Sequence, residues 1–455
     1  MGDRPAEVRI HDFLEVDTGL TAEEAVLEAE RCIQCKKPGC VKGCPVGIDI
    51  PSFIAAVAGR DFTRASAIIK EENLFPAICG RVCPQEVQCE GVCIMGVKEQ
   101  PIRIGALERF VADWEREHAP SAPKIPEPGG NRVAVIGSGP AGLAAAFELA
   151  KRGHAVTMFE SLHAPGGVLM YGIPSFRLPK EIVQAEVDQL RTMGVEIRCN
   201  HLAGASVPIE ELDLYDAVLI ATGAGLPFFM GIPGEQLSGV FSANEFLTRV
   251  NLMHADQFPE YDTPIKRGSR VVVVGGGNVA MDSARVARRL GAKVTLVYRR
   301  REEDLPARKA EVERAREEGV EFLLCANPVR VLGDQFVTGV ECVKMEMCDP
   351  DMSGRPEPVP EEGSNFTVDA DILIQAIGQG PNPLLIRRLS GVSYGRKGNL
   401  VVDEAGRTTK EGYYAAGDVA TGAATVILAM GGAKQAALAI DAMLRGEPVG
   451  EGTEE

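Results

Sequence analysis

The sequence predicts an α/β protein in which a helical, cysteine-rich N-terminal part precedes two βαβ units. Two observations support this prediction. The pattern strand, glycine turn, helix and strand occurs twice, first around Gly137 and again around Gly275. In addition, eight of the twelve cysteines fall between Cys32 and Cys93, ahead of both units. In a chain without secretory features, such clustering indicates metal binding rather than disulfides.

Length and charge narrow the class of protein. A chain of 455 residues predicts about three domains. A formal net charge of −16 argues against nucleic-acid binding, which needs a basic face. The N-terminus has no signal-peptide pattern and no run of about 18 apolar residues is found, so we expect a cytoplasmic protein without a membrane span.

A segment rich in Pro, Ala and Gly, residues 117–130, separates the cysteine-rich part from the rest. Before it, apolar spacing predicts helices over "IPSFIAAVAGRDF", "TRASAIIKEEN" and "IGALERFVADWERE". The stretch "GYYAAGDVATGAATVILAMGGAKQAALAI" reads as strand, Gly-Asp loop and helix, and we assign it to the first unit. The expected domains are residues 1–125 (helical, cysteine-rich), 130–265 (first unit), 266–372 (second unit) and 373–455 (return to the first unit).

The first unit has the glycine pattern of a dinucleotide-binding Rossmann turn, formed by Gly137, Gly139 and Gly142. These glycines allow a tight turn and let backbone N–H groups approach a pyrophosphate at a helix N-terminus. Glu160 ends the second strand, where a carboxylate accepts hydrogen bonds from ribose hydroxyls. We expect FAD here.

The second unit differs at the position that selects the nucleotide. Its turn contains Gly275, Gly277 and Ala280, and the position of the carboxylate is taken by Tyr298, followed by Arg299 and Arg300. Guanidinium groups bind phosphate with charge-assisted hydrogen bonds, so the pattern favours the 2′-phosphate of NADP(H). Alternatively, residues 299–301 solvate a helix start beside two glutamates, residues 302 and 303.

Two later segments lie where flavoproteins of this plan close around FAD. One is residues 221–223; the other is residues 415–420, in which Asp418 faces the ribityl or pyrophosphate region, followed by a helix from about Thr425 whose positive end points at the flavin. The complete set of predicted nucleotide-binding residues is Gly137, Gly139, Pro140, Ala141, Gly142, Glu160, Gly167, Val168, Arg177, Ala221, Thr222, Gly223, Gly275, Gly277, Asn278, Val279, Arg299, Arg300, Ala376, Ile377, Gly378, Gly417, Asp418, Thr425 and Val426. Five of these rest on the family resemblance described below: Val168, Arg177, Ala376, Ile377 and Gly378.

The crowded cysteines form two sets of four. The first has the spacing C-x2-C-x4-C-x3-C from Cys32 to Cys44, and the second runs from Cys79 to Cys93. Zinc is the plainer alternative. Iron–sulfur is favoured because Cys44 and Cys83 each precede proline, as in bacterial ferredoxin motifs, and because a flavin fed by a two-electron donor can use one-electron acceptors.

The cysteine motif and glycine turns, together with "GGVLMYGIPSFRLP" and "YRRREEDLPA", resemble the small (beta) subunit of NADPH-dependent glutamate synthase. They resemble equally the large subunit of the electron-bifurcating NADH-dependent ferredoxin–NADP oxidoreductase, and the N-terminal half of dihydropyrimidine dehydrogenase is similar. The resemblance implies two 4Fe-4S clusters. One would be held by Cys32, Cys35, Cys40 and Cys93, and the other by Cys44, Cys83, Cys89 and Glu108, with Cys79 spare.

For Glu108 the alternative is an exposed helix carboxylate paired with Arg109 or Lys98. With the resemblance, the sequence predicts an NAD(P)H-dependent FAD and iron–sulfur oxidoreductase that passes electrons to a second redox subunit or a ferredoxin. A ferredoxin–NADP transhydrogenase of the bifurcating type is favoured. The alternatives are a glutamate synthase small subunit or homologue and, from another class, a non-enzymatic metal-binding scaffold. No nucleophile–base pair is expected, because hydride transfer needs none.

Overall fold

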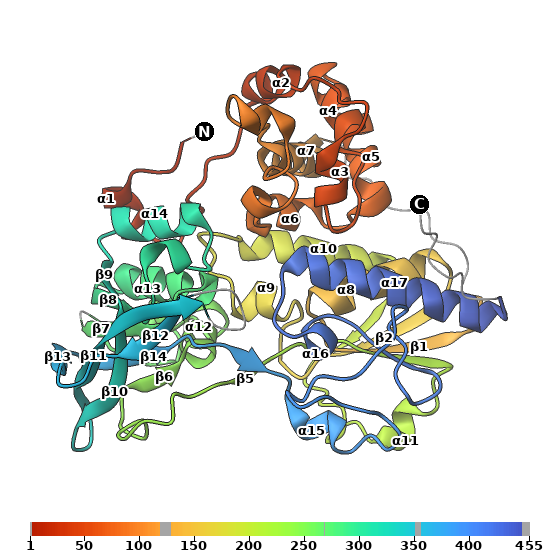
Figure 1. Ribbon diagram of the computed structural model, residues 1–455. Helices are drawn as coiled ribbons and strands as arrows, with labels where there is room; N and C mark the ends of the chain where they lie inside the picture. Colours follow the sequence, from red (N-terminus) through yellow and green to blue (C-terminus); the bar gives the residue numbers. More distant parts are fainter. Residues whose placement is uncertain (1, 119–128, 268, 351–355, 448–455) are drawn as a thin grey trace.

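The computed structural model describes residues 2–118, 129–267, 269–350 and 356–447, and the greater part of the predicted linker lies outside these ranges. Figure 1 shows three parts: a small helical domain, and below it two α/β domains side by side. The N-terminal segment reaches one of the α/β domains before the chain enters the helical domain (Figure 1).

The helical domain contains the three helices that the apolar spacing predicts. Polar N-caps set the starts of two of them: the side chains of Asp49 and Asp61 accept from backbone N–H groups of the first turns of α4 and α5. Its elements are α2 (Ala22–Glu30), α3 (Gly39–Gly43), α4 (Ile50–Ala58), α5 (Phe62–Glu72), α6 (Pro76–Val82), η1 (Gln85–Val87), η2 (Ile94–Val97) and α7 (Ile104–His118).

The first α/β domain is built on a parallel five-stranded sheet with the strand order β16-β4-β1-β2-β3. Its last strand in the chain pairs in parallel with β4, so the C-terminal stretch returns to the first unit as predicted. The strands are β1 (Arg132–Ile136), β2 (Ala155–Phe159), β3 (Glu196–Arg198), β4 (Ala217–Ile220) and β16 (Tyr413–Ala415). The helices are α8 (Pro140–Lys151), α9 (Val168–Tyr171), α10 (Lys180–Thr192), α11 (Ile209–Leu212), α15 (Pro383–Ile386), α16 (Asp418–Thr421) and α17 (Val426–Arg445).

The second α/β domain has a parallel sheet in the order β6-β14-β7-β8-β9 and an antiparallel sheet formed by β10 to β13. Its strands are β6 (Val240–Ser242), β7 (Arg270–Val274), β8 (Lys293–Tyr298), β9 (Glu321–Leu324), β10 (Ala326–Gly333), β11 (Val337–Pro350), β12 (Pro356–Pro360), β13 (Phe366–Asp369) and β14 (Ile372–Gln375). Its helices are α12 (Ala243–Asn251), η3 (Ala255–Gln257), α13 (Asn278–Arg289), η4 (Glu302–Asp304) and α14 (Lys309–Glu317). A short pair, β5 (Leu226–Pro227) and β15 (Gln379–Gly380), connects the two domains.

The second sheet extends past the range 266–372 predicted for it. Strand β6 precedes that range and β14 crosses its end, because both pair in parallel within this sheet. The short strand β6 has too few residues to show an alternating pattern in the sequence. The pairing therefore moves the expected boundaries outward at both ends.

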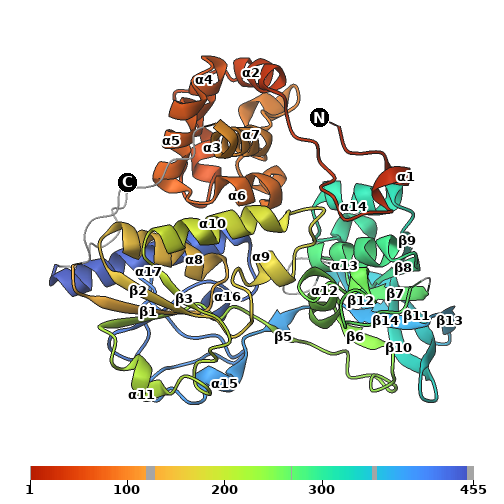
Figure 2. The same cartoon turned by 180° about the vertical axis from the view of Figure 1, so that it is seen from behind.

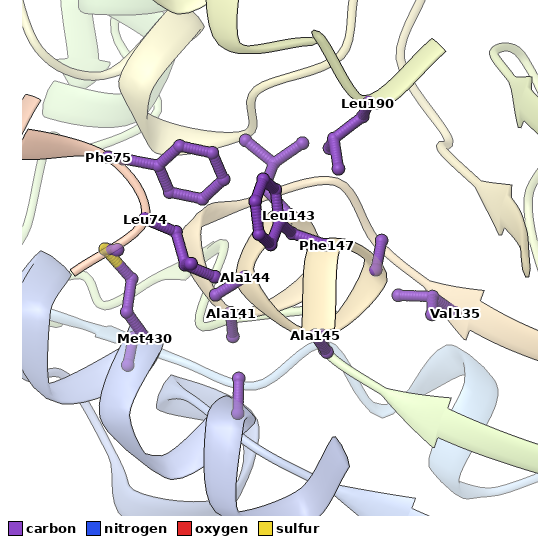
Figure 3. Packing of buried hydrophobic residues seen from close by; sticks show 14 of the residues in the cluster. Leu74, Phe75, Val135, Ala141, Leu143, Ala144, Ala145, Phe147, Leu190 and Met430 are labelled. Carbon is purple, nitrogen blue, oxygen red and sulfur yellow. The ribbon is translucent and has the colours of Figure 1, made fainter. Parts of the chain in front are cut away.

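The helical domain packs on the first α/β domain through a continuous apolar core. Leu74 and Phe75, which precede α6, reach Phe147 of α8, and Phe75 meets Phe147 edge-on with ring centroids 6.4 Å apart (Figure 3). Met430 of α17 closes the same cluster (Figure 3). Burial of such aromatic groups is worth about 1.5–3 kcal/mol for each side chain, so this interface holds the cysteine-rich domain in place.

Among the described residues one helix, α17, is long and apolar enough to cross a membrane by length and composition. The sequence analysis did not single it out. In the structure it runs alongside α8, with Ala433, Ala436 and Ile440 inside the core that covers the first sheet (Figure 1). Small residues on this face allow close helix packing, and we therefore describe α17 as a core helix.

The N-terminal arm, residues 3–17 with the short helix α1 (Ala6–Arg9), lies against α14 of the second α/β domain (Figure 2). Arg9 is buried and donates to Glu318 at 2.8 Å. Farther along the arm, the backbone N–H of Val16 donates to the carbonyl of Phe176 in the first α/β domain. The arm thus contacts both α/β domains.

Candidate functional site

A cavity of about 1630 Å³ lies between the two α/β domains. It is lined by both glycine turns and by the loops that follow β4, β14 and β16. Every predicted nucleotide-binding residue except Gly142 lines it. The cavity thus brings the two predicted nucleotide sites into one continuous space, at the carboxyl ends of parallel strands, where open α/β sheets bind ligands.

The first glycine turn has the geometry of a phosphate-binding loop. A Cβ on Gly137, whose φ is +101°, would lie 2.5 Å from the carbonyl oxygen of Ala221. A Cβ on Gly142 would lie 2.0 Å from the carbonyl oxygen of Gly137, so this glycine serves close packing of helix on strand rather than ligand contact. A Cβ on Gly139 would meet no protein atom within 4 Å and this residue lines the cavity, which leaves room for a ligand at the start of α8.

Glu160 is buried at the end of β2, where its carboxylate accepts hydrogen bonds from the backbone N–H of Ser138 at 3.0 Å and from that of Leu162 at 2.8 Å. These bonds hold the carboxylate beside the glycine turn. The hydroxyls of Ser138 and Ser161 also donate to this carboxylate, so its roughly four lone-pair directions are occupied, and a ribose hydroxyl would bind by replacing one of the two serine hydroxyls.

The C-terminal stretch completes this side of the cavity. Asp418 accepts from the N–H of Ala424 at 3.1 Å, and burial raises the pKa of its carboxyl. Thr425 is the N-cap of α17, with its side chain accepting from the N–H of Leu428. The positive end of a 20-residue helix therefore faces the cavity, as the sequence predicts.

The second glycine turn repeats the first. A Cβ on Gly275, with φ +139°, would lie 2.3 Å from the carbonyl oxygen of Ala376, whereas one on Gly277 would meet nothing within 4 Å. The Asn278 side chain, at the first residue of α13, accepts from the backbone N–H of Arg308 at 2.9 Å. Val279 and Ile377 are partly exposed toward the cavity.

The two predicted phosphate-binding arginines have different surroundings. Arg299 is exposed at the cavity and makes no ion pair within the part of the chain that the structure describes. Arg300 also lines the cavity but is buried, and its Nε donates to the carbonyl of Pro356 at 2.8 Å. Arg301 approaches Glu303 at 3.9 Å, as the helix-start alternative predicts for this arginine.

Arg177 lines the cavity together with Val168, and it also joins the two α/β domains. Its guanidinium donates to both carboxylate oxygens of Asp282 on α13, at 2.9 and 2.7 Å, and lies 3.4 Å from Glu311 on α14. All three side chains are buried. The sequence analysis did not find Asp282 or Glu311, although charged residues at inward-facing helical positions are the available signal.

Lys180 is a second residue that the sequence analysis missed. It begins α10 and donates to the carbonyl oxygens of Leu169, at 2.9 Å, and of Ile173. Both carbonyls belong to the segment around α9, which lines the cavity. Burial lowers the pKa of this amine to about 7. Through these two hydrogen bonds Lys180 stabilises the part of the cavity wall that the segment around α9 forms.

The cysteines of the helical domain fall into two groups according to which thiols influence one another. In the first, burial raises the pKa of Cys40 to about 11, and the neighbouring Cys93 and Cys32 add to this effect. Burial also raises the pKa of Cys32, with smaller contributions from Cys35 and Cys93. These are the four residues predicted to hold one cluster.

The second group contains Cys44, Cys83, Cys89 and Glu108. Burial raises the pKa of Cys89, and the Glu108 carboxylate and Cys44 add to it. Burial raises the pKa of Glu108 to about 8. Glu108 is only 6% exposed and accepts from the side-chain amide of Asn73 at 2.5 Å, so it is not the exposed helix carboxylate that the sequence left as an alternative.

Cys79 lies next to this second group. Its Sγ is 3.6 Å from the side-chain oxygen of Asn73 and 3.7 Å from the sulfur of Met430, within the interface with the first α/β domain. A hydrogen bond with Cys79 is the main cause that raises the pKa of Cys83. Cys79 is thus close enough to the second group to be an alternative to Glu108 as its fourth member.

Within the described ranges, no three His, Cys, Asp or Glu side chains converge as they would on a single metal ion. The donor chemistry of both groups nevertheless fits iron–sulfur clusters, which take thiolates and spread them over several iron atoms. Bound iron stabilises thiolates, and this would reverse the raised pKa values of the buried thiols.

The second group lies beside the nucleotide cavity. Val82 and Pro84, the two neighbours of Cys83, line the cavity together with the first glycine turn. No residue of the segments that carry the first group lines it. The described structure therefore places the second cysteine group beside the nucleotide cavity and the first cysteine group away from its lining.

Comparison with protein families gives two matches. Residues 131–442 match the model of pyridine nucleotide-disulphide oxidoreductases. Residues 9–120 match the model described as dihydropyrimidine dehydrogenase domain II, 4Fe-4S cluster. Together these matches cover the two α/β domains and the cysteine-rich domain.

Several curated proteins are similar over nearly the whole chain. The glutamate synthase [NADPH] small chain of Azospirillum brasilense is 37% identical, over 96% of this chain and 93% of the relative. The NADPH-Fe(3+) oxidoreductase subunit beta of Geobacter sulfurreducens is 38% identical, over 95% of this chain and 67% of the relative. The NADP(+)-dependent formate dehydrogenase subunit beta of Moorella thermoacetica is 39% identical, but this chain spans only 60% of its length.

Among solved structures, FprA of Mycobacterium tuberculosis in complex with NADPH is similar with a TM-score of 0.59 and 21% identity, covering 70% of this chain and 85% of FprA. Thioredoxin reductase of Lactococcus lactis gives a TM-score of 0.54 and 22% identity, covering 70% of this chain and 99% of that protein. At these identities the likeness concerns the fold of the two α/β domains.

Proposed function

Because this chain belongs to the pyridine nucleotide-disulphide oxidoreductases, in the group that includes glutamate synthase small chains, we propose that it carries electrons from NADPH to a partner redox protein. It is an NADPH-dependent oxidoreductase that binds FAD, NADP(H) and a 4Fe-4S centre. FAD accepts hydride as an electron pair and releases electrons singly, so it connects a nicotinamide to iron–sulfur clusters.

One observation carries the proposal: a single cavity is lined by both glycine turns and by the two neighbours of Cys83. Nicotinamide and flavin bound at the two turns would therefore share one space, next to a cysteine group. The turn at Gly137 and the helix α17 would hold FAD. The turn at Gly275 and Arg299 would hold NADP(H).

We further propose that the two cysteine groups hold one 4Fe-4S cluster each, with Glu108 as the non-cysteine ligand of the second. The burial of Glu108 and its proximity to three of these thiols support this assignment. Glu108→Ala should change one cluster signal in electron paramagnetic resonance and leave the other unchanged. Cys79→Ser is the matched control and should change neither; the opposite pattern would make Cys79 the fourth ligand.

The partner is proposed in two forms. The match over 93% of a glutamate synthase small chain favours a synthase chain as partner. The compact segments "GCPVGIDIP" and "QPIRIGALERF" favour instead a smaller flavin and iron–sulfur subunit, as in a bifurcating ferredoxin–NADP transhydrogenase. Anaerobic purification from the native host, with every co-purifying chain identified by mass, distinguishes the two.

Anaerobic titration with NADPH tests the proposed function itself. We expect NADPH to bleach the flavin absorbance and to generate reduced-cluster signals in the same protein, whereas NADH should act at least about tenfold more weakly because it lacks the 2′-phosphate. A protein that binds FAD but whose clusters stay oxidised after the flavin is reduced would contradict the proposal. A colourless, zinc-loaded protein would support the metal-binding scaffold instead.

A further inference from the structure

A buried amide nitrogen at the nucleotide cavity has no hydrogen-bond partner among the described residues. It is Nε2 of Gln375, one of three buried side-chain N or O atoms in these ranges that make no hydrogen bond. Gln375 is only 2% exposed and lines the cavity between the two α/β domains. The other two atoms belong to Ser269 and Arg289, which do not line this cavity. A buried N–H without an acceptor is destabilising, and a ligand in the cavity can supply the acceptor.

The orientation of this amide is fixed by its oxygen. Oε1 of Gln375 accepts from the backbone N–H of Met230 at 3.0 Å. Exchanging the amide nitrogen and oxygen would bring two donors together, so this hydrogen bond identifies which end is Nε2. The same N–H also donates to Oε1 of Glu235 at 2.8 Å. Met230 therefore keeps a partner even without Gln375, and the backbone at this point does not need the glutamine.

Gln375 is the last residue of β14 and lies at the carboxyl edge of the second parallel sheet. It pairs with Val274 of β7, and Val274 pairs with Val297 of β8. Paired residues of neighbouring parallel strands point to the same face of the sheet, and both valines also line the cavity. Because neighbouring strands lie about 4.8 Å apart, the three side chains span about 10 Å of the cavity floor.

The order of the strands indicates which part of NADP(H) would reach Gln375. Arg299, which we propose for the 2′-phosphate, follows β8, and the Gly275 turn, which we propose for the pyrophosphate, follows β7. The adenosine lies between these two phosphate groups of the nucleotide. The remaining half, nicotinamide and its ribose, therefore extends past β7 to the next strand of the sheet, which is β14.

We propose that the side-chain amide of Gln375 donates a hydrogen bond to an oxygen of the nicotinamide half of NADP(H), either that of the carboxamide or a ribose hydroxyl. The inference rests on the proposed function, because it needs NADP(H) at the second glycine turn. A site with a buried donor rejects ligands that lack the matching acceptor, since the donor then stays unpaired. Gln375 is thus a residue that determines specificity and takes no part in hydride transfer itself.

Calorimetric titration of the oxidised holoprotein with NADP⁺ tests the proposal without turnover. Gln375→Met has a side chain of similar size without the amide, and it should weaken NADP⁺ binding about tenfold. Gln375→Glu keeps an acceptor for the N–H of Met230 but replaces the donor, and it should weaken binding at least as much. Ser269→Ala is the matched control, because it removes another buried unpartnered atom outside the cavity lining, and it should leave binding unchanged.

Thermal unfolding of the protein without NADP⁺ separates a binding role from a structural one. Gln375→Met removes an unpaired buried donor while Met230 keeps Glu235, so the variant should melt at the wild-type temperature or above it. Added NADP⁺ should then raise the melting temperature less in the variant than in the wild-type protein. A variant that melts at a lower temperature but binds NADP⁺ normally would show that Gln375 only stabilises the fold, and would overturn the proposal.

Two ligands related to NADP⁺ locate the contact. 2′,5′-ADP has the 2′-phosphate but no nicotinamide half, so it should bind wild-type protein and Gln375→Met equally. If Gln375→Met weakens 2′,5′-ADP and NADP⁺ by the same factor, the assignment to the nicotinamide half is wrong. The thionicotinamide analogue of NADP⁺ carries a poor acceptor in place of the carboxamide oxygen. It should bind both proteins alike if the carboxamide is the partner, and lose about tenfold in the variant if a ribose hydroxyl is.

Failure of this inference and failure of the proposed function give different results. If the wild-type holoprotein does not bind NADP⁺, the proposed function fails together with its second nucleotide site. If the wild-type protein, Gln375→Met and Ser269→Ala all bind NADP⁺ equally, only the role of Gln375 is wrong, and NADPH can still reduce the flavin and the clusters.

Discussion

The two α/β domains have the same local plan and opposite chemistry at one position. Both contain a strand, a glycine turn with a positive-φ first glycine, a helix that begins at the turn, and a second strand. In the first domain β2 is followed by the buried carboxylate of Glu160, and in the second β8 is followed by the exposed guanidinium of Arg299. The comparison shows that the two domains share the backbone geometry of the glycine turn and differ in the side chain after the second strand, which is the side chain that we propose selects the nucleotide.

The largest effect should come from placing a side chain in one of the two glycine turns. Gly275→Val would place a side chain against the carbonyl of Ala376 at a φ that favours glycine, and should reduce NADPH binding by more than about 100-fold while FAD stays bound. Gly137→Val should do the reverse and yield protein depleted of FAD. Flavin content and NADPH titration measure both, and loss of both ligands in either variant would show that the two sites are not separable.

The second largest effect should come from breaking the ion pairs that connect the two α/β domains. Arg177→Met leaves Asp282 and Glu311 buried without this partner, which should cost about 3–5 kcal/mol and lower the melting temperature. In the double variant, Asp282→Asn removes the carboxylate charge that has lost its arginine partner and should restore part of the lost stability. Thermal melting of the single and double variants checks this. Additive losses would mean that the pair does not couple the domains energetically.

The nucleotide choice itself comes third. Arg299→Ser should weaken NADPH binding by about 10- to 100-fold, equivalent to the ~1.5–3 kcal/mol of a charged hydrogen bond, and leave NADH binding unchanged. Arg300→Ser is the informative comparison, because Arg300 is buried and donates to the carbonyl of Pro356. We expect it to affect stability more than nucleotide choice. Equal losses for NADPH and NADH in Arg299→Ser would contradict the 2′-phosphate assignment.

The smallest effect concerns the helices that follow each βαβ unit. Both α10 and α14 begin with a lysine, but Lys180 is half-buried, with its ammonium group donating to two carbonyls, and Lys309 is exposed. Because burial lowers the folded-state pKa of Lys180 to about 7, the folded protein binds fewer protons than the unfolded chain between pH 7 and the usual lysine pKa of 10.5. Stability should therefore rise with pH above 7, by up to about 1.4 kcal/mol per pH unit.

Lys180→Met should remove this slope, and Lys309→Met should keep it. Denaturant unfolding at several pH values between 7 and 9 measures the difference. A wild-type protein whose stability does not rise over this range would show that Lys180 stays protonated on its two carbonyl partners.

The sequence predicts the repeated turns, the discontinuous first domain and the helices of the cysteine-rich domain, because each has a strong local signal. Gly137 and Gly275 follow apolar strands, and Asp49 and Asp61 cap helices with a clear apolar period. These features depend on residues close together in the chain. The grouping of cysteines that the family resemblance implies stays a prediction, because the thiol with the largest effect on the pKa of Cys83 is Cys79, which that grouping leaves out.

What could not be predicted depends on contacts between distant segments. The pairing of Arg177 with Asp282 joins two domains, and the side chain of Arg300 donates to the carbonyl of Pro356, 56 positions later in the chain. The strand β6 is recognisable only from its pairing with β14. Local patterns contain no information on such partners, so these residues acquire their roles only in the folded chain.

The N-terminal arm has a consequence for how the molecule is made. Arg9 binds Glu318, a residue 309 positions later, so the ribosome must synthesise both α/β cores up to α14 before the arm can dock. Until then the buried Arg9 stays without its partner Glu318. Contacts of such long sequence separation form late and slowly. The segment that is translated before the cysteine-rich domain thus cannot complete its native contacts until residue 318 has been made, whereas β14 and β16, which complete the two parallel sheets, are translated later still.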